Sequence, residues 1–176
     1  MLACRTVART AALLLAGLMA GSASAAPLPG GASSLTESYD DWNVVCQMQN
    51  NAPTCVVRQV QAKSQTNQHV LTAEITKAPD GKYRGGLLLP LGLSLASGAQ
   101  LKIDDAALGA MQPFSVCVQQ GCLVPLVFET DAINKLKAGK ALTVTVGVLG
   151  QTEPVVFTIS LKGLSSALNR VADLTK

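Results

Sequence analysis

Four cysteines in two closely spaced pairs are the residues best placed to carry chemistry in this sequence. Cys46 and Cys55 have eight residues between them, and Cys117 and Cys122 have four. Paired thiols can form disulfides, ligate a metal or exchange electrons. Zinc sites favour short C-x₂₋₄-C spacing on both sides, and thioredoxin-like centres use C-x-x-C. We therefore favour two structural disulfides, with a redox-active pair or a metal site as alternatives.

The connectivity of these cysteines is open in principle, because four cysteines allow three pairings. Turn residues favour the two local pairs, Cys46 with Cys55 and Cys117 with Cys122. The first pair encloses "NNAP", and the second encloses Gly121. Facing positions on antiparallel strands place Cα atoms about 5.5 Å apart, as a disulfide requires. Each pair therefore predicts a stapled hairpin.

Other polar residues offer little support for catalysis. His69 is the single histidine and lies in a polar stretch without a G-x-S-x-G motif, so we expect it to be solvated. Asp40-Asp41 and Asp104-Asp105 are adjacent acidic pairs. Neighbours in a strand point to opposite faces, so these pairs predict turn residues and no catalytic dyad. We expect no catalytic residue, metal or cofactor.

The N-terminus carries the signature of a secretory signal peptide over residues 1–25. Arg5 and Arg9 precede an apolar run of ten residues, Ala11–Ala20, and small residues follow at 23–25. The run is about half of the roughly 20 residues that span a bilayer. We expect cleavage after Ala25 or Ala26 and export to the periplasm or outer envelope, where cysteines oxidise.

The charge of the exported chain argues against a nucleic-acid partner. Two of the fourteen basic residues belong to the leader, while all eleven acidic residues follow it, which leaves a net charge of +1. Affinity for nucleic acid comes mainly from positive side chains that neutralise phosphates, and a net charge of +1 supplies no strong positive field.

The elements that must position these residues are mostly strands. Residues 26–38 are small and turn-rich, so we expect a flexible segment before one domain over residues 39–176. Alternating or fully apolar runs, separated by turn signals, are typical of an all-β sandwich. These runs occupy residues 42–47, 55–61, 70–76, 86–90, 91–96, 99–104, 114–118, 122–130, 141–150 and 154–161.

Two short helices are predicted near the C-terminus. Residues 130–140 offer Thr130 or Asp131 as the N-cap and Gly139 as a left-handed C-cap. Residues 164–176 begin with a serine cap and carry apolar residues every three to four positions.

The stretch Leu87–Leu95, "LLLPLGLSL", is the most ambiguous feature. Burial as a pair of core strands around Pro90 is the simpler interpretation. The alternative is an exposed apolar edge that makes a peripheral membrane contact or meets a partner.

Six blocks of the sequence occur in a characteristic order: "YDDWNVVCQ", "APTCVVRQ", "LLLPLGLSLASGAQLKID", "PFSVCVQQGCLVPLVF", "LKAGKALTVTV" and "LKGLSSALNRV". In this order they resemble the invasion-associated locus B family of exported bacterial proteins. The likeness runs from about Asp41 to Leu174. It implies an immunoglobulin-like β-sandwich in the bacterial envelope and supplies no catalytic residues. Positions that match as structural marks are the four cysteines, Trp42, Pro90, Gly92, Pro113 and Gly121.

Together these features predict a non-enzymatic envelope protein that binds a macromolecule of the envelope or host, in host-cell invasion or envelope maintenance. The alternative is an envelope enzyme, either a thiol oxidoreductase that uses Cys117 and Cys122 or a weak hydrolase.

The first testable prediction concerns the leader. Protein recovered from the periplasmic fraction should have lost residues 1–25 or 1–26, because the cut follows small residues after the apolar run. Intact-mass spectrometry measures this directly, and a mass that retains Met1–Ala25 contradicts it.

Overall fold

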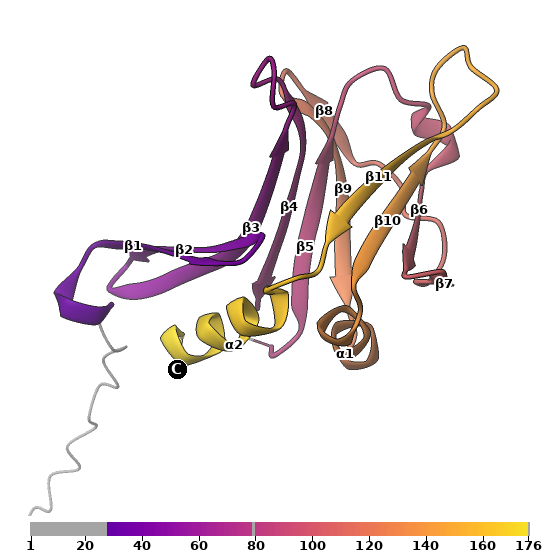
Figure 1. Cartoon of the computed structure of the whole chain (residues 1–176). Coiled ribbons are helices and arrows are strands. Elements are labelled where there is room, and N and C mark those ends of the chain that lie inside the picture. The colour runs from indigo at the N-terminus through magenta and orange to yellow at the C-terminus, as the bar shows by residue number, and fades with distance from the viewer. Residues whose placement is uncertain (1–27, 79, 176) are drawn as a thin grey trace, which may run out of the picture.

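Residues 28–78 and 80–175 are described by a computed structural model, in which two antiparallel sheets and two helices surround one core (Figure 1). The larger sheet holds, in spatial order, β1 (Ser34–Tyr39), β2 (Trp42–Gln49), β3 (Ala52–Ala62), β4 (His69–Lys77), β5 (Tyr83–Leu89), β9 (Gly121–Phe128) and β8 (Val116–Val118). The smaller sheet holds β11 (Val155–Ser160), β10 (Ala141–Val146), β6 (Ala99–Ile103) and β7 (Ala106–Ala107). The helices are α1 (Thr130–Ala138) and α2 (Leu164–Leu174), with short 3₁₀ turns η1 (Pro29–Gly31) and η2 (Leu95–Ser97). The predicted all-β sandwich with two short helices is confirmed.

The strands form where apolar residues alternate with polar ones. In β2, Trp42, Val44 and Cys46 are buried, while the residues between them are at least partly exposed. This period of two places one side of the strand in the core, and β4 repeats it with Leu71, Ala73 and Ile75. The buried face of the larger sheet meets the smaller sheet and α2 in a single apolar cluster.

Helix α2 supplies an apolar layer over the first strands of the larger sheet. Leu164, Ala167, Leu168 and Val171 are buried and recur every one to four residues, which places them on one side of the helix. The helix packs against β1, β2, β3 and β4. The β1–β2 hairpin, which extends beyond the smaller sheet in Figure 1, is therefore covered by α2.

Three side chains of the larger sheet close the outer edge of the smaller one. The Trp42 indole nitrogen and the Gln59 amide donate to the Ser160 carbonyl at 2.8 and 3.0 Å. The Gln61 amide donates to the Thr158 carbonyl at 2.9 Å. Gln59 is the buried polar residue of the described chain, and these bonds satisfy the edge carbonyls of β11.

The fold begins earlier than the sequence predicts. Residues 26–38 were expected to be flexible, but Ser34–Tyr39 pairs along its length with β2, and Leu28 is buried. The strand was missed because its residues alternate between half-buried and exposed, without a long apolar run. Its place depends on pairing with β2 and contact with α2, which are tertiary effects.

The predicted helix caps are also corrected. Helix α1 starts at Thr130 after Glu129, with no side-chain capping bond, and α2 starts after Gly163, which has φ +87°. Gly139 has φ −76°, so it is not left-handed. A Cβ atom at Gly139 would lie 2.5 Å from Ile103 Cγ2 and 3.1 Å from Leu161 Cδ1, so close packing explains this glycine.

The second testable prediction follows from this packing. Gly139→Ala should lower the free energy of unfolding by about 1–3 kcal/mol, because the added methyl overpacks the site. Thermal or urea denaturation measures the loss. In an Ile103→Ala background, which removes the nearest methyl, the same change should cost clearly less. Equal costs in both backgrounds would point to a backbone effect instead.

Candidate functional site

The four described cysteines form two disulfides, each across a strand pair. Cys46 on β2 is bonded to Cys55 on β3 with a Cα–Cα distance of 4.1 Å, and both are buried. Cys117 on β8 is bonded to Cys122 on β9 with a Cα–Cα distance of 4.0 Å. Cys122 is buried, whereas Cys117 is exposed. These are the local pairs that the turn residues favour, and in this state no thiolate is present on them to act as nucleophile or ligand.

His69 opens β4 and is exposed to solvent. Its Nε2 lies 2.9 Å from the Thr72 hydroxyl, a contact within its own strand. Within residues 28–78 and 80–175, no group of three or more His, Cys, Asp or Glu side chains is arranged to hold a metal ion.

Both acidic pairs lie in turns. Asp40 has φ +49° between β1 and β2, and its carboxylate pairs with Lys162 at 3.0 Å. Asp104 has φ +42° after β6, and its Oδ1 accepts bonds from the amides of Lys140 and Ala141 at 3.0 Å. These carboxylates are therefore engaged in turn structure, as their positions in the sequence indicate.

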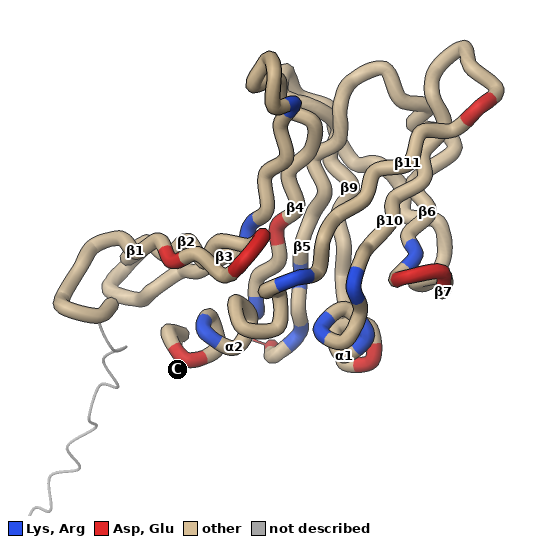
Figure 2. Tube along the Cα trace, in the orientation of Figure 1, with Lys and Arg blue, Asp and Glu red and all other residues tan. Residues whose placement is uncertain are grey.

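Charged side chains are distributed unevenly over the molecule. Figure 2 shows most Lys, Arg, Asp and Glu positions near the helices and along β1–β5, with few at the opposite end of the sandwich. Five ion pairs link this charged side of the described chain. Exposed pairs of this kind contribute about 0–1 kcal/mol each, so they shape the surface more than the stability.

The least exposed of these ion pairs connects α2 to β1. Arg170 donates through Nε and Nη2 to the two oxygens of Glu37 at 2.8 and 2.7 Å, and the Tyr39 hydroxyl donates to Glu37 at 2.9 Å. The Arg170 bond lowers the pKa of Glu37; burial works against this, and the Tyr39 bond adds to it. Burial, followed by the Glu37 bond, raises the pKa of Tyr39.

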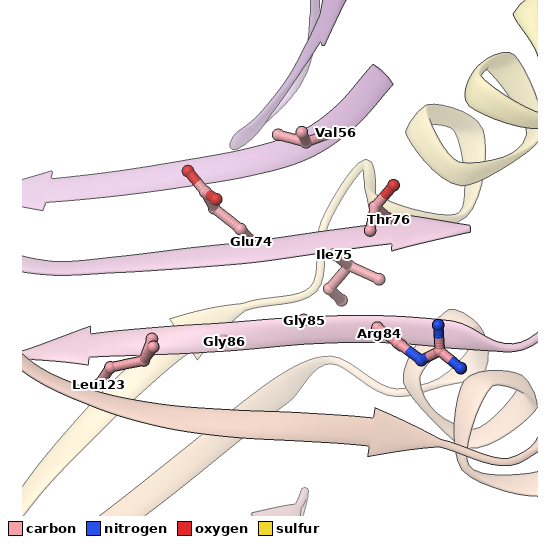
Figure 3. Close-up of a pocket in the computed structure, with 8 residues that line it drawn as sticks. All are labelled: Val56, Glu74, Ile75, Thr76, Arg84, Gly85, Gly86 and Leu123. Atoms are coloured by element: carbon pink, nitrogen blue, oxygen red, sulfur yellow. The ribbon is translucent and has the colours of Figure 1, made fainter. Parts of the chain in front are cut away.

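A hollow of about 280 Å³ lies on the outer face of the larger sheet (Figure 3). Gly86 and Leu123 line it, and Glu74 and Arg84 flank it. Both charges are already paired, Glu74 with Arg58 and Arg84 with Asp80, each at 2.6 Å. The hollow is therefore a concave surface whose charged rim residues are both in ion pairs, and its lining contains no nucleophile or general base that is free to react.

A larger groove of about 690 Å³ lies near the end of the sandwich that carries few charges. It combines neutral amides with apolar side chains, and His69 lines it. Its lining residues are Gln68, His69, Thr72, Leu88, Pro90, Leu91, Gln119 and Gln120. Such a surface can bind neutral or apolar groups, but it holds no acid–base pair for catalysis.

The stretch Leu87–Leu95 is partly buried in the core and partly exposed, so each of its two interpretations holds for some of its residues. Leu87, Leu89 and Leu93 are buried, as a core position requires, whereas Leu91 and Leu95 are exposed. A second strand after Pro90 was expected, but the chain makes only an isolated bridge and a 3₁₀ turn there. Pro90 lacks an amide donor and Gly92 has φ +89°, so the strand cannot continue.

The sequence did not reveal the hollow or the groove. Both join residues from separate strands, and the pairings of β4, β5 and β9 bring them together. Glycines in a strand, Gly85 and Gly86, were the available signal, because they mark a bulge or a close approach.

Comparison with known families gives a match over residues 42–172 to the family described as "Invasion associated locus B (IalB) protein". The chain belongs to this family. The resemblance noted in the ordered sequence blocks is thereby confirmed.

Two relatives extend the IalB comparison over most of the chain. An invasion protein B homolog of Brucella abortus is 52% identical over 155 residues, which cover 88% of this chain and 89% of the relative. Invasion protein B of Bartonella bacilliformis is 33% identical over 155 residues, covering 87% and 83%. Neither name denotes an enzyme class.

A solved IalB structure shares the fold. The crystal structure of invasion associated protein B from Bartonella henselae matches with a TM-score of 0.75 and 30% identity. The match covers 80% of this chain and 97% of that one.

Family positions outside the cysteines have visible structural roles. Trp42 is buried, and Pro90 follows the last residue of β5. Gly121 has φ +149°, and a Cβ atom there would collide with the carbonyl of Leu89. Trp42, Pro90 and Gly121 therefore have roles in the fold of this IalB protein.

Two features bear on where an IalB protein of this kind works. Both disulfides fit a protein exported to an oxidising compartment. In the part of the chain that the structure describes, no helix is long and apolar enough to cross a membrane.

The third testable prediction concerns the Glu37–Arg170 pair. A carboxyl whose pKa is lowered on folding adds stability above its unfolded pKa and loses this contribution as pH falls through the folded pKa. Arg170→Met should therefore lower Tm most at neutral pH, and the difference from wild type should shrink in acid. Arg170→Lys, which keeps the charge and loses the two-pronged bond, should recover part of Tm. A difference that is the same at neutral and acidic pH would contradict the linkage.

Proposed function

We propose that this protein is a non-enzymatic binding protein of the bacterial envelope, exported to the periplasm or outer envelope, that acts in host-cell invasion or in envelope maintenance. The observation that carries the proposal is family membership over nearly the whole folded chain, with relatives named invasion protein B. The engagement of the reactive side chains supports it. The four described cysteines are oxidised, and the His69 ring lies within hydrogen-bonding distance of the Thr72 hydroxyl.

A thiol oxidoreductase is the second candidate. The exposure of Cys117, on the short edge strand β8, favours it because an exchanging thiolate must reach a disulfide sulfur. The spacing C-x₄-C and the burial of Cys122 count against it, because the second sulfur is shielded.

The fourth testable prediction separates these two functions. Deleting the gene from the parent bacterium should reduce the number of intracellular bacteria in an antibiotic-protection assay or raise detergent sensitivity. Wild-type chain should restore the phenotype, and so should two variants, His69→Ala and the double change Cys117→Ser with Cys122→Ser. A binding protein needs none of these groups for chemistry.

Controls make this complementation interpretable. Immunoblots must show equal amounts of each variant, because loss of one disulfide costs about 2–3 kcal/mol and can reduce abundance. Titration of native wild-type protein should find no free thiol. Stable variants that fail to complement would replace the binding role with an enzymatic one.

A further inference from the structure

Several segments of the chain contain no Asp, Glu, Lys or Arg, and three of them hold most of the exposed large apolar side chains of the described chain. These three are residues 85–101, 106–128 and 141–152. Seven of the nine large hydrophobic residues that are exposed in the described chain lie within them. Exposed apolar side chains that gather where charge is absent indicate an interaction surface, because scattered ones would lie among charges as elsewhere on a protein.

Loops from these three segments meet at one end of the sandwich. The Leu149 amide donates to the Gly92 carbonyl at 3.0 Å, and the Ser94 amide donates to the Gly147 carbonyl at 2.8 Å. Ala99 and Gln112 exchange two backbone bonds of 2.8 Å. Figure 1 shows η2 and the β10–β11 loop at the end opposite α1 and α2. The loops are therefore held side by side before any partner binds.

Each of these loops presents large apolar side chains to solvent. Leu91 is 57% exposed, Leu95 44%, Met111 52% and Leu149 74%. We call these four residues the apolar end. Burial of Leu87, Leu89 and Leu93 excludes them from this surface, so it differs from the stretch that the sequence suggested.

The size of the apolar end argues against a second copy of the chain as its partner. Four side chains at these exposures present on the order of 400 Å², about half of the ~800 Å² per partner that a stable protein interface buries. They also stand on three loops, Leu91 and Leu95 on one and Met111 and Leu149 on one each, so each loop can insert its own side chains into a fluid phase. A bilayer surface needs no complementary pocket, since its headgroup region adapts to each inserted side chain.

The charge of the apolar end selects the kind of lipid. Glu153 lies in the β10–β11 loop, four residues after Leu149, and Lys63 directly follows β3, while residues 85–101, 106–128 and 141–152 contribute no charge. Exposed neutral amides, Gln119 and Gln120 on the β8–β9 turn and Gln151 beside Leu149, can bond to headgroup oxygens. An anionic lipid would have no cluster of cations to bind.

We propose that the apolar end inserts Leu91, Leu95, Met111 and Leu149 into the interface of a bilayer with zwitterionic headgroups. The charged side of the molecule, with α1 and α2, then faces water. This proposal deepens the envelope binding role proposed above and rests on it. Attachment is peripheral and reversible, because four side chains bury less apolar surface than a spanning helix.

The fifth testable prediction uses exported protein with both disulfides intact and vesicles of phosphatidylcholine. Wild type should co-sediment with the vesicles. Leu95→Gln combined with Leu149→Gln should weaken partitioning about 100-fold, roughly tenfold for each leucine withdrawn from lipid. Val127→Gln is the matched control, since Val127 is 61% exposed but pairs with Arg84 away from the loops, and it should bind like wild type.

Two further measurements test the mode of binding. Raising NaCl or adding phosphatidylserine should leave partitioning unchanged, because no charge on the apolar end contributes. Leu149→Trp should show a blue-shifted emission on vesicles, while Trp42, the single native tryptophan, is buried and constant.

Several outcomes would overturn the proposal. They are no binding at a large lipid excess, equal losses with Val127→Gln, or binding only to anionic vesicles at low salt. Concentration-dependent dimers that Leu149→Gln abolishes, without vesicle binding, would assign the surface to a second copy. A failed vesicle assay with successful complementation by His69→Ala and the cysteine variant would remove the lipid proposal and keep the binding role.

Discussion

The closure of the smaller sheet against the larger one is the constraint on which the rest of the structure depends. Strand β11 ends its sheet, and its outward carbonyls at Thr158 and Ser160 receive donors from Gln61, Gln59 and Trp42. These side-chain donors bond two layers together that share no strand, and a typical hydrogen bond of this kind contributes about 1 kcal/mol. The chain then leaves β11 through Gly163 into α2, which packs over β1–β4.

Residues that looked reactive are used to hold backbone together. Both cystines span neighbouring strands, and Asp104 caps the amides of Lys140 and Ala141. Asp40 closes the β1–β2 turn and pairs with Lys162. A side chain with its bonding capacity committed in this way is poorly suited to turnover, because catalysis would require it to leave these partners. Family membership and the commitment of these side chains to structural bonds therefore support the binding role proposed above.

The two ends of the sandwich differ in their content of charged side chains. The end with α1 and α2 is rich in ion pairs, whereas the opposite end consists of loops with few charges that are joined by backbone hydrogen bonds (Figure 2). Backbone pairing lets these loops expose Leu91 and Leu149 without losing their conformation. Because this pairing orders the loops in advance, little entropy would be lost when a partner binds.

The sequence by itself determined the fold class, the local cysteine pairs, both helices and most strands, because period-2 burial, turn residues and helical spacing are local signals. Only the tertiary structure decided that Ser34–Tyr39 is a strand, since its polar residues pair with β2 and carry Glu37 to Arg170. It also decided that residue 139 must be glycine, because Ile103 leaves no room for a Cβ atom there. It decided as well which leucines of the 87–95 stretch are buried. The apolar end joins three loops distant in sequence, so its pattern became visible only when hydrogen bonds between Leu149 and Gly92 and between Ala99 and Gln112 brought them together.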